Sequence, residues 1–153
     1  MTQGRSGLVS NRQDKIRVGV AALERFAREV CRELKLSDDA VAVQLISDAS
    51  MARLNRRYRK KRGATDVLSF PAQSANGDAG ARRAEASYIG DVAISPSMAR
   101  RNARRDGRSL ADELKILLLH GMIHLAGYDH ESDQGQMQRL EMKLRRRLGL
   151  AAQ

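Results

Sequence analysis

The chain has 153 residues, a formal net charge of +10 and a single cysteine, Cys31. This length is typical of one domain, and an apolar content of 42% suffices for a packed core. One cysteine excludes an intramolecular disulfide and favours the reducing cytoplasm, where we expect Cys31 to be a buried thiol. No apolar run reaches transmembrane length, and residues 1–10 lack the pattern of a signal peptide, so we expect no membrane partner.

The positive charge is carried mostly by arginine. The planar guanidinium group binds phosphate oxygens in pairs, so a strongly basic domain predicts a polyanionic partner. A basic surface that only keeps the protein in solution is the alternative interpretation. Aromatic residues make up 3% of the chain, which argues against a platform that stacks several bases, as in RNA-recognition motifs.

The first half of the chain alternates between predicted strands and helices. Apolar residues recur at helical spacing from residue 16, and a period of two follows from residue 41. Ser47 and Asp48 are suitable caps for the second helix, and Pro71 ends the third strand. The predicted elements are a weak strand at residues 8–10, a helix at 16–36, a strand at 41–46, a helix from 48 to about 58, and a strand at 67–70.

The second half begins with residues 71–86, whose Ala, Gly, Asn and Ser content predicts an exposed mobile loop. Capping hydroxyls at Ser95 and Ser109 each predict a helix start. From residue 114 to 126 the helix is apolar nearly all round, which predicts that it lies at the centre of the fold. The predicted elements are a strand at residues 87–95, helices at 96–106 and 110–126, and a last helix from 132 or 133 to 147. Together they predict a single α+β domain over residues 1–153, with a small mixed sheet.

All three histidines of the chain fall in the segment HGMIHLAGYDH. His120 and His124 are four residues apart, so they share one face of a helix. Gly127 can end that helix and allow the chain to bring His130 back to the same point. Three imidazoles bind Zn²⁺ and leave one tetrahedral position for water, which is typical of a catalytic zinc rather than a structural one. The alternative is three unrelated histidines, which would leave several buried ring nitrogens in need of partners.

The spacing H-x-x-x-H-x-x-G-x-x-H is also that of the metzincin proteases. In those enzymes a glutamate follows the first histidine and acts as the general base, whereas this chain has Gly121. The sequence therefore predicts a zincin-like metal site without peptidase activity. A glutamate placed at residue 121 would restore that carboxylate and is expected to bring negative charge beside the phosphate of a polyanionic substrate.

Three stretches together resemble the YbeY family of bacterial endoribonucleases. They are HGMIHLAGYDH, LNRRYRKKRGATDVLSFP at residues 54–71 and YIGDVAIS at residues 88–95. The resemblance implies one zinc ion on His120, His124 and His130, a mixed four-stranded sheet with about five helices, and cleavage of single-stranded ribosomal RNA. It also implies a functional role for Arg59. Lys60 and Ala64 depart from the family pattern in the loop after Arg59, although the loop length is unchanged.

Arg59 ends a predicted helix beside further basic residues. It is interpreted either as the group that grips the scissile phosphate or as part of a solvated charged surface. Thr65 and Asp66 are expected to cap a turn or to orient a basic group. Asp91 follows a glycine that suggests a bulge or a close approach to a ligand, and it is interpreted either as a hydrogen-bond partner of a metal-bound imidazole or as a plain edge carboxylate.

The same two readings apply to Asp129. The tyrosines Tyr58, Tyr88 and Tyr128 are interpreted as packing residues rather than catalytic groups.

The predicted function is metal-dependent hydrolysis of RNA in ribosomal RNA maturation and ribosome biogenesis, with His120 and Arg59 as catalytic groups. RNA, the ribosome or its small subunit is the expected partner, and DNA is not. A non-catalytic assembly factor that binds ribosomal RNA through a structural zinc is the alternative, and a metallopeptidase is disfavoured by Gly121.

Overall fold

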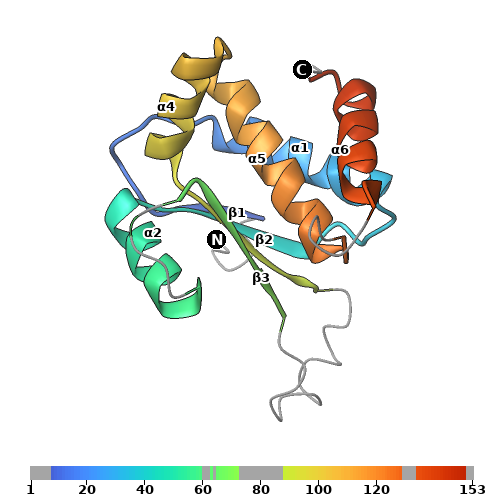
Figure 1. Ribbon diagram of the computed structural model, residues 1–153, viewed down its shortest axis with the longest axis horizontal. Coiled ribbons are helices and arrows are strands. Elements are labelled where there is room, and N and C mark those ends of the chain that lie inside the picture. Colours follow the sequence, from blue (N-terminus) through green and yellow to red (C-terminus); the bar gives the residue numbers. More distant parts are fainter. Residues whose placement is uncertain (1–7, 60–62, 64, 73–87, 129–133, 151–153) are drawn as a thin grey trace.

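Figure 1 shows the computed structural model, which describes residues 8–59, 63, 65–72, 88–128 and 134–150. Strands and helices alternate along the first part of the chain, and helices follow. The elements are β1 (Val9–Asn11), α1 (Val20–Glu33), β2 (Val41–Leu45), α2 (Asp48–Leu54), the π-helical turn η2 (Asn55–Arg59), β3 (Val67–Pro71), β4 (Gly90–Ile94), α4 (Pro96–Asp106), α5 (Leu110–Leu125) and α6 (Gln136–Arg147).

The four strands form one sheet in the order β1-β2-β4-β3. β1 and β4 both run parallel to β2, and β3 closes the edge antiparallel to β4. The described part of the chain thus has five α-helices beside a mixed four-stranded sheet, which confirms the predicted α+β class.

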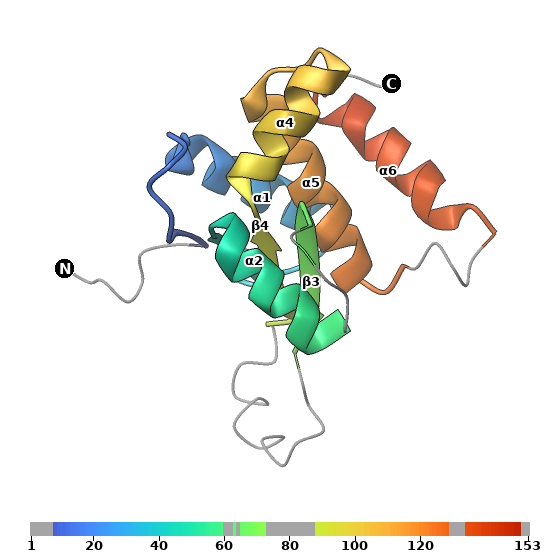
Figure 2. The ribbon, with the colours of Figure 1, turned by 60° about the vertical axis from the view of Figure 1, so that its left-hand side comes forward.

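The two faces of the sheet are covered by different helices. Because side chains alternate along a strand, Val43, Val92 and Ile94 face the main core under α1 and α5. Leu68 and Ala93 face the other way and pack against α2. Figure 2 shows α2 on the side of β3 and β4 away from α5.

The predicted apolar helix is α5, and it is central. It contacts β3, β4, α1, α4 and α6. Its middle residues Leu118, Leu119, Met122 and Ile123 have no exposed surface. Burial of each of these side chains contributes about 1.5–3 kcal/mol, so this helix is the main anchor of the fold.

Side-chain caps begin three of the helices as predicted. The hydroxyls of Ser47, Ser95 and Ser109 accept hydrogen bonds from backbone N–H groups three residues on. Gly107 ends α4 in the left-handed conformation with φ of 70°. Cys31 is buried, as expected, and burial raises the pKa of its thiol.

Several predicted boundaries are wrong by a few residues. The first helix begins at Val20 and not at Ile16, because the Gln13 side chain bonds both the backbone N–H and the carbonyl of Ile16 and holds a turn there. The α-helix after Ser47 ends at Leu54 and continues as the wider η2 turn to Arg59.

Two further elements, a helix and a strand, also begin later in the chain than predicted. The last helix begins at Gln136 because Gly135, with φ of 95°, is left-handed. The strand predicted from residue 87 begins at Gly90. Of the predicted loop at 71–86, Pro71 belongs to β3 and Ala72 bonds the carbonyl of Ile89, while residues 73–86 lie outside the described part of the chain.

Candidate functional site

His120 and His124 lie on the last turns of α5 and face the same way. Their ring centroids are 4.9 Å apart, with an angle of 80° between the ring planes. The spacing of four residues therefore brings the two imidazoles together, as predicted. The side chain of His120 is 30% exposed, so it lies at the edge of the core and can reach a ligand from solvent.

Glu141 of α6 holds the His120 ring. Its Oε1 lies 2.9 Å from His120 Nδ1, and its Oε2 accepts a hydrogen bond from Arg145 at 2.9 Å. Burial opposes the charge on Glu141, but the contacts with His120 and Arg145 outweigh it and hold the pKa of this carboxyl below its ordinary value. An ionised carboxylate only accepts hydrogen bonds, so His120 Nδ1 is the donor in this contact. A carboxylate on Nδ1 is the contact that orients a histidine which binds a metal through Nε2.

Sequence reasoning missed Glu141, although a signal for it exists. Met137, Glu141 and Leu144 are spaced by four and three residues, so they share one face of α6. All three are buried. A glutamate in the apolar stripe of a helix requires a partner, and the histidines of α5 are the candidates that the sequence offers.

The third predicted ligand, His130, lies outside the described residues, as does Asp129. Among the residues that are described, no group of three metal-ligating side chains assembles. Those residues therefore contribute two imidazoles, one of them fixed by a carboxylate, to the predicted three-histidine site.

Gly121 packs directly against the sheet. A Cβ atom at this position would lie 2.8 Å from Val92 Cγ1 and 3.1 Å from Ser69 Oγ. Ser69 also donates a hydrogen bond to the Gly121 carbonyl at 3.1 Å. The expectation that a glutamate here would bring its charge beside the phosphate is wrong, because a side chain at residue 121 would point into the sheet and collide with β4.

Arg59 and the two histidines line the same cavity. This cavity, the histidine pocket, has a volume of about 370 Å³ and is also lined by residues 65–69, Pro71 and Leu125. Arg59 reaches it because the η2 turn carries the chain from α2 toward the edge strand β3. Asn55, at the start of η2, is buried and donates to the carbonyl of Gly63 at 2.9 Å, which fastens the turn. π-helical turns are often found at functional sites.

Thr65 and Asp66 line this pocket at the entry to β3. The Asp66 carboxylate accepts a hydrogen bond from Asn102 of α4 at 3.0 Å, and its carbonyl accepts one from the backbone N–H of Ser95. Both of these contacts of Asp66 are with α4 and its cap, which supports the turn or cap interpretation.

Asp91 does not approach His120 or His124. It lies on β4 in the same alternation as Ala93, and its carboxylate accepts a hydrogen bond from the Tyr88 hydroxyl. Asp91 therefore does not orient His120 or His124, which favours the edge-carboxylate interpretation, and Glu141 is the carboxylate that contacts His120. At Gly90 the predicted close approach is made by other parts of the protein and not by a ligand. A Cβ atom there would meet the Phe70 carbonyl at 2.5 Å and Leu125 at 2.8 Å.

Two of the tyrosines are more exposed than packing residues would be. Tyr58 is 56% exposed and Tyr128 is 38% exposed.

In the described part of the chain, no helix combines the length and apolar character that a membrane span requires.

Comparison with known proteins agrees with this architecture. Residues 8–149 match the protein family described as endoribonuclease YbeY. A relative of that name from Solibacter usitatus is 47% identical over 130 residues, covering 84% of this chain and 79% of the relative. Another from Koribacter versatilis is 48% identical over 110 residues, or 72% of this chain and 65% of the relative.

A solution structure of a protein from Thermotoga maritima superimposes with a TM-score of 0.57 at 27% identity, over 88% of this chain and 83% of that one. The family match covers nearly the whole chain and includes the elements that carry Arg59, His120 and His124. The chain therefore belongs to the endoribonuclease YbeY family.

Proposed function

We propose that this chain is a zinc-dependent endoribonuclease that cleaves single-stranded ribosomal RNA during maturation of the ribosome. The observation that carries the proposal is the presence of Arg59, His120 and His124 in one pocket. A phosphate-binding guanidinium group beside two imidazoles that can hold a metal is suited to the cleavage of a phosphodiester. The family description and the net charge of +10 support RNA as the substrate.

The donor set fits zinc. Imidazole nitrogen is a common ligand of Zn²⁺, and the contact of the Glu141 carboxylate with His120 Nδ1 is of the kind that orients metal-binding histidines. His120 and His124 would hold the ion together with His130. Zinc bound there would supply a water of lowered pKa and a Lewis acid for a phosphoryl oxygen.

Arg59 binds and orients the scissile phosphate. Its guanidinium group donates to two phosphate oxygens at once and offsets the negative charge that develops on them during cleavage. Arg56 and Arg57 precede it on η2 and are exposed, so they extend the basic surface along the RNA backbone.

No carboxylate of the described pocket is suited to act as general base. Asp66 is the acidic residue among the described lining residues, and Asn102 bonds its carboxylate. The 2′-hydroxyl of RNA is an internal nucleophile, and hydroxide derived from the water that zinc would hold could accept its proton in place of a carboxylate. A peptide has no internal nucleophile, and residue 121, where a metallopeptidase carries its base, has no room for a side chain.

The test is cleavage of a single-stranded ribosomal RNA fragment by the purified chain with zinc supplied. Wild type should cut the RNA and leave casein intact. His120→Ala should lose both bound zinc and cleavage. Arg59→Ala should keep zinc but lose most cleavage, and its affinity for RNA should depend less steeply on salt, by about 0.7 in the log–log slope for one lost phosphate contact.

Arg104→Ala is the matched control, because it removes the same charge from an exposed position on α4 and should cleave like wild type. RNA binding without any cleavage would favour the assembly-factor alternative. Casein hydrolysis that is lost in His120→Ala would favour a peptidase.

A further inference from the structure

A second cavity lies on the opposite face of β3 from the histidine pocket. It has a volume of about 650 Å³, within the range usual for small-ligand sites. Its floor is the sheet face that points away from α5. Gln44 on β2, Ala93 on β4 and Leu68 on β3 are cross-strand neighbours in one row, and Asp91 with Phe70 forms the next row. Leu54, Tyr58 and Arg59 form the wall.

The two cavities share their boundary. Arg59 lines both, as do Leu68, Ser69 and Pro71 of β3. When Arg59 holds a phosphate beside the histidines, the base of the adjoining nucleotide would therefore be able to reach the second cavity. This continuity links the second cavity to the site at which the RNA backbone is proposed to bind.

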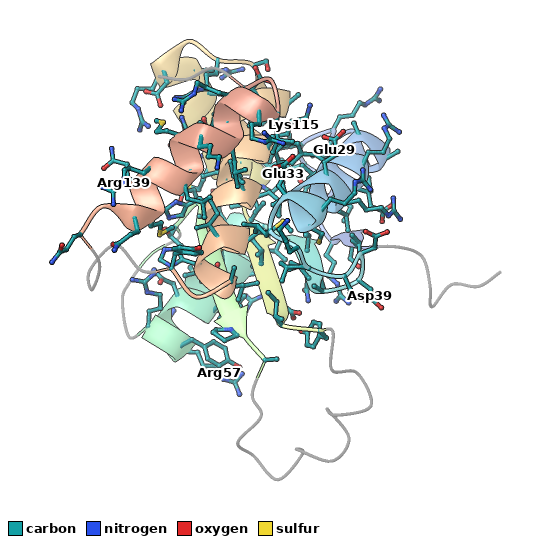
Figure 3. The ribbon with its side chains drawn as sticks, turned by 90° about the vertical axis from the view of Figure 1, so that its right-hand side faces the viewer. Glu29, Glu33, Asp39, Arg57, Lys115 and Arg139 are labelled. Atoms are coloured by element: carbon teal, nitrogen blue, oxygen red, sulfur yellow. The ribbon has the colours of Figure 1, made fainter. Side chains whose placement is uncertain are left out.

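The wall of the second cavity is chemically suited to an aromatic ring. Tyr58 is 56% exposed, and its ring meets Phe70 edge-to-face at a centroid distance of 5.2 Å. Arg57, which extends outward from η2 in Figure 3, lies with its guanidinium carbon 5.6 Å from the centroid of the Tyr58 ring. An exposed tyrosine with arginines beside it is a common arrangement for stacking an unpaired base, because the arginines also bind the adjoining phosphates.

The floor offers hydrogen-bonding groups among apolar ones. Asp91 presents carboxylate oxygens, and the Tyr88 hydroxyl bonds one of them and fixes the group. Gln44 presents an amide, which both donates and accepts. Guanine carries two adjacent donors, N1–H and the N2 amino group, next to the O6 acceptor. A carboxylate beside an amide matches that edge, whereas uracil places a carbonyl on each side of its single N–H and would repel the carboxylate.

We propose that this second cavity binds an unpaired RNA base, guanine by preference, of a nucleotide next to the phosphate held by Arg59. Tyr58 stacks on the base, and Asp91 with Gln44 reads its edge. The proposal rests on the proposed function for the identity of the polymer, and it adds a site that selects where the RNA is bound.

The test is equilibrium binding of the full-length, zinc-supplied chain to short single-stranded RNAs. The strands carry 2′-O-methyl riboses, are checked on a gel to remain intact, and consist of adenosines with guanosine, uridine or an abasic residue at one position. The guanosine strand should bind about tenfold more tightly than the other two, the size expected for one stacked and paired base.

Three variants assign the effect to residues. Tyr58→Ala should remove the preference for guanosine over the abasic strand, and Tyr58→Phe should keep it because the ring remains. Asp91→Asn should remove the discrimination against uridine, while the abasic strand should still bind more weakly than the guanosine strand. The Tyr88 hydroxyl can still donate a hydrogen bond to the amide oxygen of this variant. Circular dichroism melting checks that each variant is folded.

Equal binding of all strands by wild type, no binding at all, or an unchanged preference in both Tyr58→Ala and Asp91→Asn would overturn the proposal. Cleavage of ordinary RNA is measured in parallel. Zinc-dependent cleavage without base preference in binding rejects the base site alone. A guanosine preference that depends on Tyr58, without any cleavage, rejects the nuclease function alone.

Discussion

The two faces of the edge strand β3 differ in how closely they are packed. On the face toward α5, Ser69 bonds the Gly121 carbonyl, and helix and sheet approach so closely that residue 121 has no side chain. On the face toward α2, Leu68 and Phe70 belong to a small apolar cluster beside a cavity of about 650 Å³. Close packing at Gly121 holds the imidazoles of α5 in place beside the smaller histidine pocket, and looser packing on the other face leaves the larger cavity. Arg59 borders both.

The largest expected effect is on stability, and it tests the close packing of Gly121 against the sheet. Gly121→Ala places a methyl group 2.8 Å from a methyl of Val92 and should lower the free energy of unfolding by about 1–3 kcal/mol, despite the better helix propensity of alanine. Gly121→Glu adds a buried, unpaired carboxylate and should cost at least about 4 kcal/mol. Urea denaturation of both variants measures these losses.

The collision also predicts coupling between α5 and β4. Val92→Ala removes the methyl groups that the new Cβ would strike, so the double variant with Gly121→Ala should be more stable than the sum of the single losses predicts, by about 1 kcal/mol. Gly19→Ala is the control, because its methyl group enters open space. Additive losses, or a Gly121→Ala protein as stable as wild type, would show that helix and sheet are not in close contact here.

A smaller effect is expected from the carboxylate that holds His120. Glu141→Gln keeps the size of the side chain but loses the charge that fixes the Nδ1–H tautomer and balances Arg145. Zinc affinity, measured by competition with a chromogenic chelator, should fall about 10-fold or more. Nitrogen NMR shifts of the His120 ring in the metal-free protein should show a mixture of tautomers.

Glu33→Gln provides the matched control for Glu141. Glu33 also pairs with an arginine of α6, with 2.8 Å between its Oε1 and Arg147 Nε, but it belongs to α1 and is not a partner of a histidine. It should bind zinc like wild type. Equal zinc affinity and identical histidine shifts in Glu141→Gln and wild type would remove Glu141 from the site.

Local patterns in the sequence were enough to predict α5 and its two histidines. Capping by Ser109, the apolar run and the four-residue spacing all act within one helix, so no knowledge of the tertiary structure was needed. The contact between His120 and Glu141 spans 21 residues and depends on how α6 packs on α5. No local pattern encodes that packing.

The role of Asp91 and the direction of a side chain at residue 121 were not predictable from the sequence, for one physical reason. A one-residue step reverses the face of a strand and turns a helix by about 100°, so the role of each residue depends on register and packing. The same holds for Tyr58, whose exposure follows from the unpredicted π-helical turn after Leu54.

The smallest expected effect on stability concerns α2, which covers the more loosely packed face of β3. Asp48 fastens the start of α2 to α4. Asp48 accepts hydrogen bonds from the Ser95 hydroxyl at 2.6 Å and from Arg101 at 3.1 Å. Partial burial opposes the charge on Asp48, but these contacts, with the charges of Arg101 and Lys15, hold the pKa of the carboxyl below its ordinary value. The folded state therefore favours the ionised form.

A lowered pKa in the folded state fixes the sign of the pH dependence. The stabilisation is fully present above the ordinary pKa of an aspartate, about 3.9, and is lost as the pH falls through the lower pKa of the folded state. Since the Asp48 side chain is 39% exposed, water screens the pair, and Asp48→Asn should cost only about 0.5 kcal/mol at neutral pH. Urea unfolding of the two proteins from pH 7 down to about pH 3 should show this difference shrink below pH 4. A difference that stays constant over this range would mean that α2 is held by packing alone, and a loss as large as that of Gly121→Ala would mean that the two faces of β3 are equally rigid.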